Sequence, residues 1–253
     1  MAYPAWVLIL LPPSESKATR TRGARLRWDG LSAPELTDTR RQVAEALGRA
    51  SSRIDASVVL GVSANLADEI ARNRRLKTSP TLPARELYTG VLYDALDLAS
   101  LETSASRRAT ARLRVVSALY GAVKMTDRVA PYRLSMAVNL PGVGPLASFW
   151  RPHLGPVLTQ AAGRGLVVDC RSSTYAAAWS PDGAVAERWV QVRVPGATHM
   201  AKLTRGLVAR TLCLEAADPR RPEELVDLLS PHHEVTLAQP ESAGRPWVLD
   251  VIT

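Results

Sequence analysis

The chain has 253 residues, of which 46% are hydrophobic and 22% charged, a balance that supports a buried core and excludes wholesale disorder. Basic residues outnumber acidic ones by 32 to 24, so the formal net charge of +8 favours nucleic acid, anionic surfaces or acidic small molecules as partners. Two cysteines cannot build a disulfide framework, and no stretch approaches the roughly 20 apolar residues of a membrane helix.

The basic excess has a second interpretation. Only four of the 32 basic residues are lysines, and a preference for arginine is typical of a G+C-rich genome as well as of an anionic partner. Where arginine is the usual basic residue, a lysine suggests a need for a compact ammonium group or for one that can lose its proton. Lys17 and Lys202 lie in motif-like segments, whereas Lys77 has the context of an ordinary surface residue.

The elements begin with a short apolar run that predicts a buried strand over Trp6–Leu11, ended by Pro12 and Pro13. The run has no basic residues before it and no small-residue cleavage site, so it does not resemble a signal peptide, and we expect a cytoplasmic protein. After a polar loop, Ser32 is followed by a proline and a glutamate, which predicts a capped helix to about Ala50.

The remaining elements are taken in chain order. We expect helices over 63–75, 91–96, 104–112, 147–162, 172–179 and 200–216, and strands over 115–117, 166–169, 185–194, 234–237 and 248–251. Leu203, Leu207 and Leu214 share one side of the last long helix. The mixture predicts a single α/β (mixed α+β) domain over 1–253 with a central mixed sheet, and the two prolines of 78–83 mark a candidate sub-boundary.

The loop after the first strand is the first candidate site. Ser14 and Ser16 can donate hydrogen bonds and Lys17 supplies charge, which suits an anion held at a strand end. Glu15 can orient the lysine or act as a base. The alternative is a solvated turn, and too few glycines are present for a Walker loop.

Large polar groups in apolar surroundings mark a second segment, which contains Tyr120, Asp127, Tyr132 and Arg133. Such groups are either hydrogen-bonded inside the fold or turned toward a ligand. A structural role is favoured for most of them, whereas the planar guanidinium of Arg133 suits phosphate or carboxylate.

A proline-glycine segment, Leu-Pro-Gly-Val-Gly over 140–144, is typical of helix-hairpin-helix modules. In those modules glycines such as Gly142 and Gly144 expose backbone N–H groups to a DNA phosphate. The same pentapeptide also forms ordinary turns, and the preceding residues 134–140 have no convincing helical pattern.

Two later segments add polar groups. Ser172, Ser173 and Tyr175 follow a predicted strand, and hydroxyls at a helix start can hold an anion. Cys170 is more in keeping with a buried structural thiol than with a nucleophile. Lys202 and Arg205 share a face of the last long helix, either as a ligand-binding pair or as a solvated basic face.

Seven short segments of the chain, in this order, resemble the YaaA family of bacterial peroxide-stress proteins. They are Ser14–Lys17, Tyr88–Gly90, Leu119–Gly121 with Asp127, Pro131–Met136, Phe149–Trp150, Ser172–Tyr175 and Lys202–Gly206. The resemblance implies a compact α/β fold with a basic cleft and a helix-hairpin-helix-like element, together with DNA binding and a role in limiting oxidative damage, partly by restraining free iron. Lys17, Arg133, Lys202 and Arg205 would line the cleft.

This chain departs from the family pattern where a ligand is expected. Val123-Lys124-Met125 replaces the usual Arg-Pro, Ser135 replaces an acidic residue, and Ser172-Ser173 replaces Ala-Ser. These changes suggest a divergent member with altered chemistry.

Two main functions remain open. The first is a DNA-binding protective protein. The second is an enzyme that acts on a nucleotide, nucleobase or other small anionic substrate through Lys17 or Lys202, with Glu15, Asp127 and Arg133. The expected partner is therefore DNA or a phosphate-bearing small molecule. The spacing of histidines, cysteines and carboxylates predicts no metal site, and we expect no cofactor.

Overall fold

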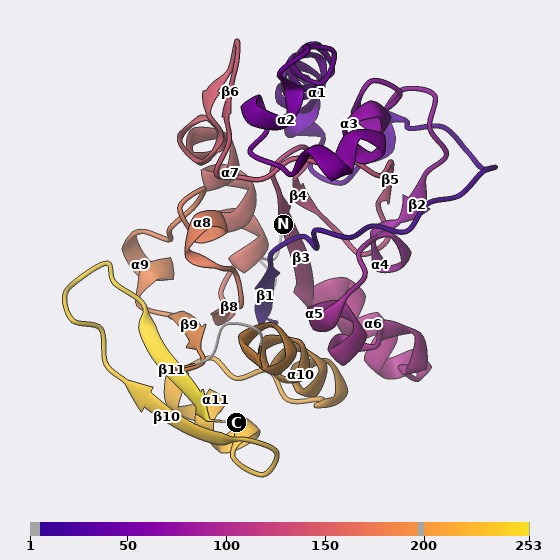
Figure 1. Ribbon diagram of the computed structural model, residues 1–253. Helices are drawn as coiled ribbons and strands as arrows, with labels where there is room; N and C mark the ends of the chain where they lie inside the picture. The colour runs from indigo at the N-terminus through magenta and orange to yellow at the C-terminus, as the bar shows by residue number, and fades with distance from the viewer. Residues whose placement is uncertain (1–5, 197–199, 253) are drawn as a thin grey trace.

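One seven-stranded sheet forms the centre of the computed structural model, which describes residues 6–196 and 200–252 (Figure 1). Its strands are β1 (Leu8–Leu11), β3 (Leu113–Ser117), β4 (Gly121–Val123), β8 (Val167–Asp169), β9 (Trp189–Arg193), β10 (Glu234–Ala238) and β11 (Trp247–Ile252). Their order is β10-β11-β9-β8-β1-β3-β4, with five parallel strands in the middle and an antiparallel strand at each edge. This mixed sheet confirms the expected fold class.

Two smaller pairs of strands accompany the sheet. β2 (Leu82–Pro83) pairs with β5 (Arg128–Val129), and β6 (Asn139–Leu140) pairs with β7 (Gly144–Pro145), both antiparallel. The proline-rich segment at 78–83 therefore contributes its last two residues to a strand pair with a segment more than forty residues later in the chain.

Helices account for most of the remaining regular structure. The α-helices are α1 (Thr37–Ala50), α2 (Ala56–Val59), α3 (Ala67–Asn73), α4 (Ala84–Leu87), α5 (Val91–Leu96), α6 (Thr103–Arg112), α7 (Leu146–Ala162), α8 (Ser173–Ala176), α9 (Gly183–Ala186), α10 (Met200–Leu214) and α11 (Pro222–Leu229). Short 3₁₀ turns cover Trp28–Gly30, Pro34–Leu36, Ala64–Leu66 and Leu98–Ser100. No helix in the described ranges is long and apolar enough to cross a membrane.

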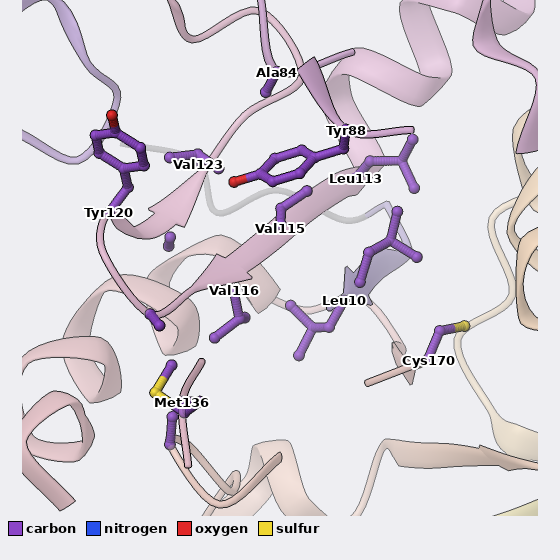
Figure 2. Close-up of a cluster of buried hydrophobic side chains, with 14 of the residues drawn as sticks. Leu10, Ala84, Tyr88, Leu113, Val115, Val116, Tyr120, Val123, Met136 and Cys170 are labelled. Carbon is purple, nitrogen blue, oxygen red and sulfur yellow. The ribbon is translucent and has the colours of Figure 1, made fainter. Parts of the chain in front are cut away.

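The central strands are buried on both faces, which explains their continuous apolar sequences. All four residues of β1 have no exposed surface. Figure 2 shows Leu10 of β1 and Val115 and Val116 of β3 in this core, with the ring of Tyr88 beside Val115. Tyr120 belongs to the same core.

The first predicted helix begins later than its sequence suggests. Ser32 is not its cap: the Ser32 N–H and hydroxyl both donate to the carboxylate of Asp127. Pro34–Leu36 form a 3₁₀ turn and the α-helix starts at Thr37. Ser32 bonds Asp127 instead of capping the helix because this bond satisfies a buried carboxylate, which a local cap cannot do.

Other differences follow from short elements that periodicity does not resolve. The strand expected over 185–194 starts at Trp189, because residues 183–186 form α9. α7 forms as expected despite Pro152 and Pro156, and both prolines lie on its exposed side, where water can serve the carbonyls that lose a helical partner. α2, α4 and α11 were not expected from the sequence.

The last long helix, α10, buries a different face from the one its leucines suggest. Leu207 and Leu214 are 37% and 48% exposed, whereas Val208 and Leu212 are buried. α10 packs against α5 (Figure 1). At Gly206, an added Cβ would lie 2.2 Å from the carbonyl oxygen of Leu92. Close backbone contact, rather than interlocked leucines, therefore sets the position of α10.

We predict that Gly206→Ala destabilises the protein by about 1–3 kcal/mol, the usual cost of forcing extra atoms into a packed core. Urea unfolding measures this change. Gly48→Ala is the matched control, since Gly48 lies in α1 with no atom within 4 Å of its added Cβ, and roughly 0.5–1 kcal/mol of stabilisation is expected there. Equal stability of Gly206→Ala and wild type would contradict the packing role.

Candidate functional site

The topology opens a crevice at the carboxyl end of two adjacent parallel strands, β1 and β8. The chain leaving β1 continues to β3 on one side, and the chain leaving β8 continues to β9 on the other. Loops that diverge in this way leave a space between them, which is where open α/β sheets bind ligands. Residues 12–17 follow β1 and residues 170–175 follow β8, so two predicted site segments meet here.

A cavity of about 560 Å³ occupies this position. Nine predicted site residues line it: Ser14, Glu15, Ser16, Lys17, Arg133, Ser172, Tyr175, Lys202 and Arg205. They come from four separate stretches of the chain, so the fold gathers groups that lie up to 191 positions apart.

The loop after β1 is held by the segment between α4 and α5. The N–H of Thr89 donates to the hydroxyl of Ser14 at 3.2 Å, and Lys17 forms an antiparallel bridge with Tyr88. The Tyr93 hydroxyl donates to the Pro12 carbonyl at 2.7 Å. The Tyr88-Thr89-Gly90 motif therefore acts as a support that fixes the loop carrying Lys17.

The ammonium of Lys17 lies inside this support. It donates to the carbonyl oxygens of Ser14 at 2.7 Å and Glu15 at 3.3 Å, and it lies 4.4 Å from the ring centroid of Tyr132. Burial, together with the positive charge of Arg133, lowers the pKa of Lys17 to about 7, against the opposing effect of Glu69 and Glu15. Lys17 can therefore exist as a neutral amine near neutral pH.

Arg133 is fixed at its backbone and paired at its side chain. The amide of buried Asn73 bonds both the N–H and the carbonyl of Arg133, at 2.8 and 2.9 Å. The guanidinium lies 3.3 Å from a carboxylate oxygen of Glu69 and 3.9 Å from one of Glu15. It is 19% exposed, so one side remains open to the cavity.

Lys202 and Arg205 enter the site from the opposite wall, on α10. Lys202 lies 3.8 Å from Glu15, and the Nε–H of Arg205 donates to the Val192 carbonyl at 3.3 Å. Glu15 is 75% exposed and lies between the charges of Arg133 and Lys202. Its carboxylate thus occupies the space between two cations from distant parts of the chain.

Tyr88 and Tyr132 do not line the cavity wall and belong to a buried layer of hydroxyl groups. The Tyr132 hydroxyl is 2.7 Å from the Ser117 hydroxyl and 3.5 Å from that of Tyr88. Burial raises the pKa of both phenols well above 10, so both remain protonated. Their rings form the surface against which Lys17 packs.

Two predicted residues are structural instead. The Tyr120 hydroxyl bonds both the N–H and the carbonyl of Ala130, and its ring is fully buried. Asp127 accepts from Ser32 and from the N–H of Lys124 at 2.9 Å, and it does not line the cavity. A catalytic role for Asp127 therefore has no geometric support.

The Leu-Pro-Gly-Val-Gly segment forms the β6–β7 hairpin rather than a helix-hairpin-helix. Only α7 follows it, and residues 126–145, all described, contain no helix before the turn. Gly142 and Gly144 have positive φ angles that the tight turn requires, and they lie outside the cavity, as does exposed Ser173. The expectation of a helix-hairpin-helix-like element is not met.

Cys170 is buried, and burial raises the pKa of its thiol to about 12, so it is not an activated nucleophile. Its neighbour Arg171 pairs instead with Asp169 at 2.6 Å, and both side chains are fully buried. In the described ranges, no group of histidine, cysteine and carboxylate side chains is arranged to hold a metal ion.

Sequence reasoning missed three residues that build the site: Glu69, Asn73 and Tyr93. Tyr93 follows Gly90 by three positions, and this helical spacing from a recognised motif could have indicated it. Nothing local marks Asn73 or Glu69, because their partner Arg133 is about sixty positions away.

We predict that Lys17 makes stability depend on pH. It loses its proton at about pH 7 in the folded state but near 10.5 when unfolded, so between these values the unfolded chain binds the extra proton. Stability of the wild type relative to Lys17→Met should therefore rise from pH 7 to pH 10. Urea unfolding across this range measures the difference. Lys77→Met, at an exposed position, is the control, and a flat difference for Lys17→Met would contradict the burial of its ammonium.

Comparison with known proteins agrees with this arrangement of motifs. A family model described as peroxide stress protein YaaA matches residues 7–235. A UPF0246 protein of Streptomyces coelicolor is 49% identical over 97% of this chain and 98% of its own length. A UPF0246 protein of Corynebacterium efficiens is 39% identical over 88% of this chain and 91% of its own length. A UPF0246 protein of Corynebacterium glutamicum is 35% identical over 91% of this chain and 98% of its own length. The chain therefore belongs to the YaaA family of peroxide stress proteins.

Proposed function

We propose that this YaaA family member binds a phosphate-bearing molecule in the cavity between β1 and β8. The observation that carries the proposal is the convergence of Arg133, Lys202 and Arg205 on one cavity from opposite walls. Guanidinium and ammonium groups that face a common space bind a phosphate more tightly than the same charges spread over a surface.

The position of Glu15 supports the same assignment. Its carboxylate lies 3.8–3.9 Å from the nitrogens of Lys202 and Arg133, at the outer limit of an ion pair, and it remains largely exposed. Pairs of this kind contribute little stability, so a phosphate can displace the carboxylate at low cost. Glu15 thus marks where the anion of the ligand would lie.

The phosphate can come from a small molecule or from DNA, and the site favours the small molecule. A cavity of about 560 Å³ is within the usual range for small-molecule pockets. DNA is the second candidate, supported by the net charge of +8 and by the exposed position of Lys202 near the mouth. The β6–β7 hairpin offers no helix-hairpin-helix for a DNA backbone.

Binding of adenosine monophosphate and inorganic phosphate, measured by isothermal titration calorimetry, tests the small-molecule assignment. Arg133→Gln and Lys202→Gln should each weaken binding about tenfold or more, the loss expected for one charge-assisted hydrogen bond. Lys77→Gln removes the same charge at an exposed position outside the cavity and should bind like wild type.

Fluorescence anisotropy with labelled duplex, single-stranded and abasic DNA across a salt series tests the second candidate. Tight, salt-sensitive DNA binding that is lost in Arg133→Gln, together with no binding of the small phosphates, would transfer the function to DNA. Absence of binding to every one of these ligands would overturn the proposal.

We also predict that Glu15→Gln strengthens phosphate binding severalfold, because it removes a carboxylate that competes for Arg133 and Lys202. The same titration measures the change. Glu45→Gln, an exposed change of equal charge on α1, provides the control. Weaker binding in Glu15→Gln than in wild type would show that Glu15 assists the ligand rather than competing with it.

A further inference from the structure

Lys17 has a position that phosphate binding alone does not require. Arginines supply 28 of the 32 basic residues, and Arg133 and Arg205 already face the cavity with groups better suited to phosphate. Lys17 instead lies on the supporting tyrosine layer with its nitrogen fixed by two backbone carbonyls. An amine offers one property that a guanidinium lacks, a lone pair once its proton is lost.

The hydrogen bonds at Lys17 suit a neutral amine. A neutral amine has two N–H donors and one lone pair, and the carbonyl oxygens of Ser14 and Glu15 accept both donors. The lone pair is then left for reaction, with the side chain lining the cavity. The carbonyls also fix the direction of the nitrogen, which reduces the entropy lost when a substrate approaches.

We propose that Lys17 is a nucleophile that forms an imine with a phosphate-bearing aldehyde or ketone held by Arg133 and Lys202. This inference rests on the proposed phosphate site and names the substrate class of that site. The low pKa of Lys17 supports it, because the neutral form is populated near pH 7.

The reaction balances without a further reactant. The Lys17 lone pair attacks the carbonyl carbon, the C=O π pair moves to oxygen, and a proton passes from nitrogen to that oxygen to give a carbinolamine. The nitrogen lone pair then expels the hydroxyl group as the C=N bond forms, and the remaining N–H proton of the carbinolamine passes to this hydroxyl, which leaves as water. Glu15, on the same loop and lining the same cavity, is the carboxylate available to carry these protons.

Reductive trapping of the full-length protein tests the inference. The probe is D-glyceraldehyde 3-phosphate with sodium cyanoborohydride, followed by peptide mass mapping. The chain contains only four lysines, so Lys77 and Lys124 serve as internal references. We expect Lys17 to be modified at least about tenfold more than either, since a neutral amine is far more reactive than an ammonium.

Three controls separate a reactive site from general lysine modification. D-Glyceraldehyde, which lacks the phosphate, should modify Lys17 much less, and excess inorganic phosphate should protect Lys17 against the phosphorylated probe. Lys17→Arg should lose the adduct while retaining the charge. The phosphate-protection experiment uses only wild-type protein, so it decides the question even if Lys17→Arg does not fold.

The outcomes distinguish this inference from the proposed function. Calorimetric phosphate binding without a Lys17 adduct would overturn imine formation and leave the phosphate site in place. A Lys17 adduct that is indifferent to both the probe's phosphate and the competitor would overturn the phosphate site as well. Preferential trapping by an abasic oligonucleotide over the small probe would overturn the small-molecule substrate.

Discussion

The divergence of the chain at β1 and β8 is the constraint on which the rest of the site depends. Both strands are fully buried, so neither can shift without loss of core packing, and their register fixes where each following loop begins. The loop after β1 carries Lys17 and the loop after β8 carries Tyr175. A rigid sheet therefore sets the distance across the cavity, while the polar groups stand on short, supported loops.

Three arginines of the described residues are buried and bond groups inside the protein. Arg40 donates to four backbone carbonyls, those of residues 32, 33, 120 and 122. Arg112 similarly donates to the carbonyl of Leu212 in the last turn of α10 and to those of Glu215 and Ala217 just after it. Arg171 is buried against Asp169. These guanidinium groups bond backbone oxygens and a carboxylate inside the protein, so the net charge of +8 overstates the cationic surface offered to a ligand.

The cavity concentrates like charges that are only partly compensated. Burial lowers the pKa of Lys17 most, the positive charge of Arg133 lowers it as well, and Glu69 and Glu15 offset these effects in part. An anion that enters the cavity would relieve the remaining repulsion, which supports the proposed phosphate ligand. Gly206 contributes indirectly, since its close contact with Leu92 brings α10, and with it Lys202, to this wall.

The sequence by itself determined the central strands, the long helices α1, α7 and α10, and most of the polar groups of the cavity, because buried apolar runs and local motifs leave signals within a few residues. Only the tertiary structure showed that Asp127 and Tyr120 serve the fold, that Leu-Pro-Gly-Val-Gly forms a β-hairpin, and that Asn73 positions Arg133. Each of these outcomes depends on a hydrogen-bond partner or a strand pairing that the type of the residue does not specify. The hydrogen-bond partner can lie far along the chain, as Ser32 does from Asp127. The periodicity of a helix likewise cannot show which face meets a neighbour when, as at Gly206, backbone contact decides the packing.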